Sequence, residues 1–246
     1  MMEIQKFMVL SLILLLHAVV TAQNSDVYNS GLSVKSNRLP GKLTGEVFYL
    51  SLNSNSSHFL QQDWVEGTIT LKDGDVYEGI RMRYKAIDDE LVAYNSNIQT
   101  LFIVDKNTVK QFTYKVPSGS GTFNERKFVN LDSLDTYLGR TFFEELYPGS
   151  AKLLAFYQIE EIKVNPYVDN TGKMRDTEFR LKTIYYILTK TIGLSRIQLK
   201  NRSLFTLYPE NKKEIRKLLR KSRIAIADEH SAIQAFKLLD ENGFLK

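Results

Sequence analysis

Short runs of alternating apolar and polar residues fill the central part of the chain, and the clearest of them form a hairpin. Segments 65–71 and 76–84 are both rich in apolar residues, and the turn residues Asp73 and Gly74 lie between them. Successive side chains on a strand point to opposite faces, so a period of two predicts two antiparallel strands with one shared face. An Asp-Gly pair at this position is typical of a tight hairpin turn.

The register that this turn predicts contains one local conflict. With Asp73 and Gly74 as the turn, Leu71 pairs with Val76 and Ile69 pairs with Glu78. An acid opposite an isoleucine is unfavourable on a face that becomes buried. A β-bulge at the neighbouring Gly79 would remove the conflict and turn the acid to solvent.

Further strand patterns occur at short spacing on both sides of this hairpin, separated by segments rich in Gly, Pro, Asn, Asp and Ser. They cover residues 45–52, 91–94, 99–104, 110–116, 126–131, 141–147, 152–164, 179–188 and 197–207. We expect an antiparallel β meander at 61–207 that forms a barrel or a sandwich. We interpret 23–60 as a loosely structured leader and 165–176 as a polar loop.

The apolar period changes after residue 208. Ile215, Leu218 and Leu219 form a stripe at helical spacing, and Asn211 with Glu214 fits a capping box. A second helix begins at Asp228, with apolar residues at helical spacing through residue 239 and Gly243 as its C-terminal cap. We therefore predict a mainly β, α+β fold with a C-terminal helical hairpin at 208–246, packed on the β domain.

The first 22 residues match a secretory signal peptide. A short segment with the basic Lys6 precedes an apolar run at 7–20, and Val20-Thr21-Ala22 provides small residues before a cleavage site at Gln23. The alternative is a membrane anchor, but the run is shorter than the roughly 20 residues of a spanning helix. We expect an exported mature chain without a transmembrane segment.

Composition narrows the possible chemistry. The chain has no cysteine, which excludes thiol catalysis, thiolate zinc sites and iron–sulfur clusters. Without disulfides, the exported chain depends on its hydrophobic core. Its net charge of +5 favours contact with anionic surfaces.

Catalytic patterns are weak. After cleavage the only histidines are His58, in a polar loop, and His230, in the first turn of a helix. Neighbouring acids occur at 88–90, 144–145 and 160–161, and adjacent residues on one strand point to opposite faces. A carboxylate pair would therefore need acids from two different strands. We assign no catalytic, cofactor-binding or metal-binding residue and expect no cofactor.

The strongest chemical signal is a basic run near the C-terminus. It contains one acid, Glu214, and its cations are Lys212, Lys213, Arg216, Lys217, Arg220, Lys221 and Arg223. Opposite the apolar stripe, these residues form the basic face of an amphipathic helix that can contact an anionic surface. The alternative is a solvated helix whose stripe packs on the sheet. No aromatic residue interrupts the run, so we expect no nucleic-acid partner.

The turn and strand pattern at 67–74, followed by Gly79, Tyr84, the strand at 101–104 and Phe112, resembles a group of exported Bacteroidota proteins of unknown function. In that group a β region is followed by a Lys-rich helical end, similar to 212–236 here. The resemblance covers most of 61–240 and implies the envelope of a diderm bacterium, without site residues. Asp132-Ser133-Leu134 is similar to the triplet that is glycosylated in exported proteins of that phylum.

These observations favour a non-catalytic binding or scaffold module of the bacterial envelope. We expect it in the periplasm, with secretion or outer-membrane association as alternatives. The expected partner is an anionic envelope surface or another envelope protein. Two other functions stay open: a small β-barrel carrier of an apolar ligand, and a carboxylate-dependent hydrolase.

Overall fold

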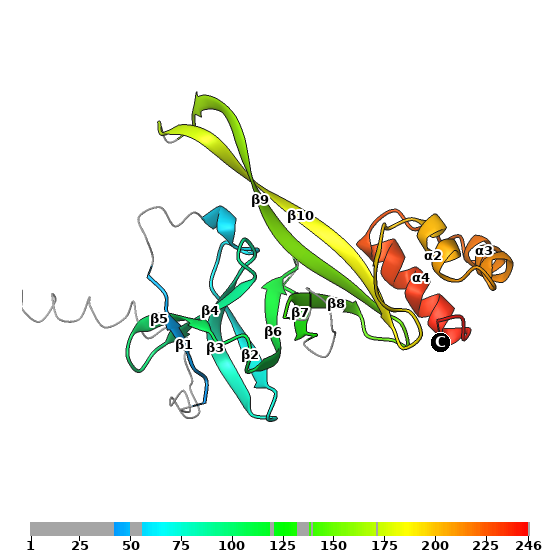
Figure 1. Cartoon of the computed structure of the whole chain (residues 1–246), viewed down its shortest axis with the longest axis horizontal. Coiled ribbons are helices and arrows are strands. Elements are labelled where there is room, and N and C mark those ends of the chain that lie inside the picture. The colour runs from blue at the N-terminus through cyan, green and yellow to red at the C-terminus, as the bar shows by residue number, and fades with distance from the viewer. Residues whose placement is uncertain are drawn as a thin grey trace, which may run out of the picture. The chain divides into compact units, whose positions relative to one another are not determined.

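Eleven antiparallel strands form one sheet in the computed structural model, which describes residues 42–49, 56–118, 121–131, 138, 140–170 and 172–245 (Figure 1). These residues all fall within one compact unit, 38–246. The predicted signal peptide at 1–22, much of the predicted leader and the Asp132-Ser133-Leu134 triplet lie outside the described residues.

The sheet order is β1-β5-β4-β3-β2-β6-β7-β8-β9-β10-β11. The strands are β1 (Gly45–Val47), β2 (Val65–Leu71), β3 (Val76–Lys85), β4 (Glu90–Asn95), β5 (Thr100–Val104), β6 (Val109–Pro117), β7 (Phe123–Asn130), β8 (Phe142–Tyr147), β9 (Lys152–Val168), β10 (Met174–Thr189) and β11 (Gly193–Ile197). The sheet is open, with β1 and β11 at its ends, so it is not a closed barrel and is compatible with a sandwich. The predicted mainly β fold with C-terminal helices is confirmed.

The first hairpin contains the bulge that the register conflict predicts. Gly67 pairs with Ile80, but Ile69 pairs with Tyr77, so β3 carries one extra residue between these pairs. Gly79 adopts a positive φ of 68°, which costs a glycine little. The predicted pairs Ile69–Glu78 and Leu71–Val76 are wrong, because Ile69 lies opposite Tyr77 and Thr70 opposite Val76 next to the turn. The bulge restores the predicted register at Gly67 and Ile80, and Glu78 is exposed. This hairpin is part of the scaffold.

The predicted strand at 197–207 is wrong beyond its first residue. β11 ends at Ile197, and a helix, α2, covers Asn201–Leu207. Leu204 is buried and Leu207 and Tyr208 follow it at helical spacing, so this segment packs with a helical rather than a strand period. The helical region therefore starts before residue 208.

Two more helices follow, α3 (Lys212–Lys221) and α4 (Glu229–Glu241). The predicted capping role of Asn211 is wrong, because its side chain makes no hydrogen bond to the first turn of α3. Asp228 does cap α4, in a reciprocal capping box with Ser231. Gly243 has a φ of 74° and its N–H donates to Asp240 O over 2.9 Å, which confirms the predicted C-terminal cap.

Separate hydrophobic clusters hold the sheet and the helices. In the sheet, Phe112 and Phe128 stack with ring centroids 4.7 Å apart, and Tyr84 and Phe142 pack beside them. In the second cluster, the helical residues pack on apolar side chains of β9, β10 and β11, with Phe236 among the most buried. The C-terminal helices are thus anchored to one end of the long strands.

β9 and β10 form a ribbon that outruns its neighbours (Figure 1). β8 pairs with β9 at 153–155 and β11 pairs with β10 at 185–189, whereas β9 and β10 pair with each other as far as Val168 and Met174. The predicted polar loop at 165–176 is therefore wrong at both ends. Backbone pairing between the two strands continues although Val168 and Met174 are largely exposed.

Candidate functional site

A cluster of buried charged and phenolic side chains lies in a pocket between β7, β8, β9 and the first turn of α4. The pocket is lined by Leu60, Val116, Asn124, Glu125, Arg126, Glu144, Glu145, Leu146, Tyr157, Leu181, Glu229 and Ile233. The polar residues come from four separate elements, so only the folded sheet and the docked helix bring them together.

The centre of the pocket is the carboxylate of Glu144. Arg126 Nε donates to Oε1 over 2.8 Å, and the same guanidinium donates to Oε2 over 2.5 Å. Tyr157 OH also donates to Oε2, over 2.5 Å. Sheet register creates this cluster, because Phe128 pairs with Glu144 and Ala155 pairs with Glu144 on the other side. Arg126 lies two residues before Phe128 on β7, and Tyr157 lies two residues after Ala155 on β9. Both side chains are therefore on the same face of the sheet as Glu144.

Burial and charge determine the protonation of this cluster. Burial alone would lower the pKa of Arg126, but its hydrogen bond and ion pair with Glu144 outweigh burial and raise it above the ordinary range. Burial, reinforced by the charge of Glu144, raises the pKa of Tyr157 well above the usual phenol range. Both donors therefore keep their protons at neutral pH, and the Glu144 carboxylate accepts three hydrogen bonds.

Glu145 lies on the opposite face of β8, as the alternation predicts. Lys127 Nζ and Lys152 Nζ donate to its two oxygens over 2.8 Å and 2.7 Å, and its side chain is only 2% exposed. Burial alone would raise the pKa of Glu145, but the two lysines outweigh burial and lower it. Both acids of this pair are thus neutralised by cations.

Glu229, in the first turn of α4, also lines the pocket. Tyr185 OH donates to Glu229 Oε1 over 2.8 Å. Burial and then this contact raise the pKa of Tyr185, and Glu144 adds to the effect. Glu229 likewise adds to the raised pKa of Tyr157. The carboxylates of Glu144 and Glu229 thus act on the same two tyrosines from different elements.

Sequence patterns did not identify this constellation. The acidic pair at 144–145 was visible, but nothing in the chain linked it to Arg126, Tyr157 or Glu229. The signal that could have helped is strand register: a cation on β7 two positions from the partner of an acid on β8.

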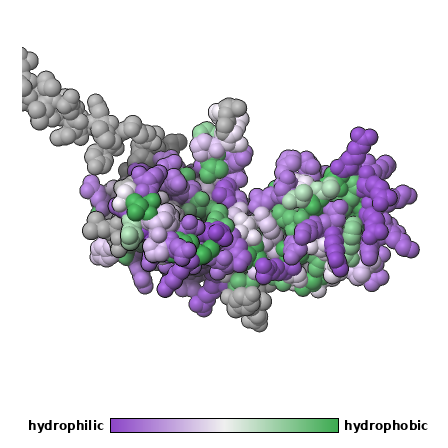
Figure 2. Space-filling view, turned by 90° about the horizontal axis from the view of Figure 1, so that it is seen from above, coloured by the Kyte–Doolittle hydropathy of each residue, from purple (hydrophilic) through white to green (hydrophobic). Residues whose placement is uncertain are grey.

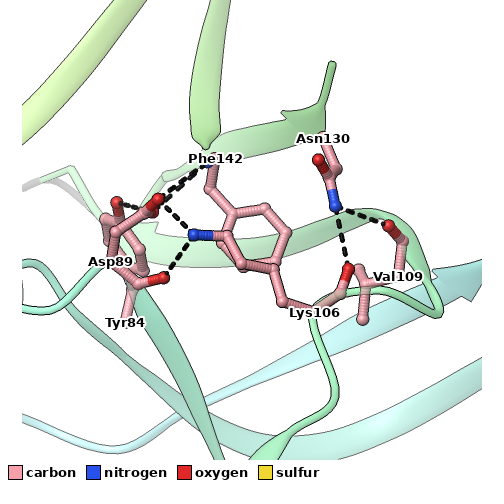
Figure 3. Close-up of polar contacts among 6 residues, drawn as sticks. All are labelled: Tyr84, Asp89, Lys106, Val109, Asn130 and Phe142. Carbon is pink, nitrogen blue, oxygen red and sulfur yellow. Dashed lines mark hydrogen bonds and ion pairs between the residues drawn. The ribbon is translucent and has the colours of Figure 1, made fainter. Parts of the chain in front are cut away.

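Another buried carboxylate, Asp89, joins β3, the β5–β6 turn and β8 (Figure 3). It accepts from Tyr84 OH over 2.7 Å and from the backbone N–H of Phe142 over 3.2 Å, and it forms an ion pair with Lys106. Asn130 Nδ2 donates to the Lys106 carbonyl over 2.9 Å. The predicted fully solvated turn at 88–90 is therefore wrong at Asp89, whose side chain is 15% exposed.

This Asp89 clamp has a structural role. Burial raises the pKa of Asp89 even though Lys106, Tyr84 and the Phe142 N–H all lower it. Its acceptors are occupied by donors from β3, the β5–β6 turn and β8. The contacts tie these segments into the aromatic core that contains Tyr84 and Phe142.

The predicted basic face on α3 is exposed to solvent. Six of the seven predicted cations lie on α3 and Arg223 follows its C-terminus, and all seven are exposed, whereas Ile215 and Leu219 are buried in the helical cluster. Among the described residues, none of these cations forms an ion pair with a carboxylate. Figure 2 shows long hydrophilic side chains over the end that carries the helices. The apolar stripe is occupied by the protein and is not available for insertion into lipid.

The two histidines lie apart. His58 is in a short 3-10 helix, η1 (Ser56–His58), with its ring edge-on to Phe179 at 4.5 Å, and burial lowers its pKa. His230 is exposed on α4 and hydrogen-bonds to Gln234 over 2.9 Å. In the part of the chain that the structure describes, no group of three metal-ligating side chains lies together. Within the same ranges, no helix has the length and apolar composition needed to cross a membrane.

Comparison with protein-family models, with curated proteins and with solved structures found no match for this chain.

Proposed function

We propose that this protein is a non-catalytic binding or scaffold module of a diderm bacterial envelope. The observation that carries the proposal is the contrast in how its charges are used. The acids in the sheet, Glu144 and Glu145, each accept from two cationic or phenolic side chains. A carboxylate that is ion-paired and fully hydrogen-bonded is a poor general base or nucleophile. Within the described ranges, the α3 cations have no carboxylate partner, so they can bind an external ligand.

The envelope location is supported by the sequence. An apolar run at 7–20 and a small-residue cleavage site before Gln23 are typical of exported proteins, and the absence of cysteine fits a bacterial setting. Periplasmic residence is our preferred location. Cell fractionation followed by N-terminal sequencing tests it: the periplasmic protein should begin at Gln23, and an intact N-terminus in the cytoplasm would contradict export.

Assays of the mature protein test its non-catalytic character. Panels of glycan, ester and peptide substrates should show no turnover above the rate without protein. Glu144→Gln and Glu229→Gln serve as site variants, and Glu161→Gln, at an exposed position on the ribbon, is the matched control. Turnover that disappears in the site variants and persists in the control would contradict the proposal.

One observation favours a second candidate, a carboxylate-dependent hydrolase. That chemistry requires two acids from different elements in one pocket. Glu144 on β8 and Glu229 on α4 line the same pocket. Both carboxylates raise the pKa of Tyr157 and Tyr185. The assays above separate the two candidates directly. The open sheet does not provide the closed interior that a barrel carrier needs, so we do not propose a carrier.

A further inference from the structure

We infer that the exposed face formed by α2 and α3 is the binding surface of this module and that it contacts the anionic phosphate headgroups of a membrane. This inference rests on the proposed binding function and names its partner. It starts from the distribution of charge: between residues 200 and 223 the chain has nine Lys and Arg residues and two acids, Glu210 and Glu214. Such a local excess repels itself unless anions compensate it.

The cations of α3 form two parallel rows. In an α-helix, residues four apart are neighbours on one face, so Lys212, Arg216 and Arg220 form one row. Lys213, Lys217 and Lys221 form the next. Each row spans eight residues, or about 12 Å along the helix. The helix therefore presents a broad cationic face, and its apolar residues point into the protein.

Next to these rows, α2 and α3 enclose a small cleft that suits a single phosphate group. It is lined by Arg202, Phe205, Thr206, Lys212 and Arg216. The guanidinium of Arg216 lies 5.1 Å from the centre of the Phe205 ring, which holds it over α2 and near the other two cations. Three cations from two helices thus line one cleft, and no carboxylate is among its lining residues.

The surface favours a membrane over a nucleic acid or a protein groove. Two rows of cations on a convex helix match a plane of charged headgroups. Single-stranded nucleic acid is usually held by stacking on exposed aromatic rings. α3 has no aromatic residue, and the guanidinium of Arg216 lies over the Phe205 ring of α2. Because Ile215 and Leu219 are buried, attachment should be electrostatic and peripheral, without insertion of the helix into the apolar layer.

Vesicle sedimentation of the full mature chain tests this inference. Vesicles of phosphatidylglycerol mixed with phosphatidylcholine should sediment the protein at low salt, and phosphatidylcholine alone should not. The variant Arg202→Gln/Lys212→Gln/Arg216→Gln removes the three cleft cations. At about 1 kcal/mol per cation near an anionic surface, the partition coefficient should fall about 100-fold. Added salt should weaken binding of the unmodified protein.

The matched control removes the same number of charges elsewhere. Lys110, Lys115 and Lys163 are exposed on the β domain, so Lys110→Gln/Lys115→Gln/Lys163→Gln should bind vesicles within about twofold of the unmodified protein. Unfolding midpoints of both variants confirm that the fold is kept. Equal losses in both variants, or equal binding to both kinds of vesicle, would overturn the inference.

Two competitors distinguish the source of the phosphate. Inorganic pyrophosphate, matched for ionic strength with sodium chloride, should displace little protein from vesicles if a headgroup plane is the ligand. Complete displacement, or binding to single-stranded DNA with none to vesicles, would overturn the membrane assignment. Failure of vesicle binding leaves the proposed function intact, because that proposal is tested separately by the turnover assays and by the export experiment.

Discussion

The sheet pocket and the α3 face both concentrate charge, but they use it in opposite ways. On the two faces of β8, Glu144 and Glu145 are almost completely buried and each has cationic donors within 2.8 Å. On α3, six cations face water without a carboxylate partner among the described residues. A buried charge is tolerated only when it is paired, whereas water stabilises an exposed one. The buried ion pairs therefore stabilise the fold, whereas the exposed cations of α3 are available for binding.

The largest expected effect comes from removing one partner of the Arg126–Glu144 ion pair. Arg126→Met leaves the buried Glu144 carboxylate without its bidentate donor and should lower the free energy of unfolding by about 4 kcal/mol. The double variant Arg126→Met/Glu144→Leu removes both charges and should recover most of the loss. Urea unfolding at neutral pH measures both values. A loss below about 1 kcal/mol in the single variant would mean that the pair behaves like a surface ion pair.

The next largest effect compares the stability cost of substitutions on the buried and the exposed face of α3. Ile215→Ala removes a fully buried side chain from the helical cluster and should cost about 3 kcal/mol. Lys217→Ala, two residues away and exposed, should change stability by less than about 0.5 kcal/mol. Urea unfolding of both variants is the measurement. Similar costs would contradict the assignment of Ile215 to the core and Lys217 to the binding face.

Glu145 gives a smaller effect with a defined pH dependence. Glu145→Gln should cost about 2 kcal/mol at neutral pH, because two lysines lose a charged acceptor. The two lysines lower the folded-state pKa of Glu145 below its ordinary value of 4.5. The stabilisation is therefore present above about pH 4.5 and is lost as pH falls through the lowered pKa. Unfolding curves of both proteins over a pH series should converge in acid, and a constant difference would refute this account.

The smallest effect compares two helix starts. Asp228→Ala removes the side chain that accepts from Ser231 N–H over 2.8 Å and should cost about 1 kcal/mol. Asn211→Ala should cost much less, because Asn211 makes no capping hydrogen bond. Thermal unfolding of the two variants provides the comparison. Equal destabilisation would show that Asn211 caps α3 in solution.

Local patterns predicted the sheet well where each strand had a buried face and a clear turn. Most strand runs from residue 65 to 188 lie within a few residues of their predicted ends. The errors have different causes. At α2 the apolar residues recur at helical spacing, whereas at the tip of the ribbon backbone pairing continues although the side chains are exposed. The bulge at Gly79 could be predicted because the simple register placed Glu78 opposite Ile69, and a glycine follows Glu78 directly.

By itself, the sequence determined the antiparallel β character, the turn at Asp73-Gly74 and the amphipathic character of α3, because periods of two and 3.6 residues depend only on local geometry. Only the tertiary structure decided that the sheet is open and that Glu144 meets Arg126, Tyr157 and, across the pocket, Glu229. Strand register and helix docking join residues up to about a hundred positions apart, and no local period encodes such distances. The same folding left the α3 cations exposed to solvent.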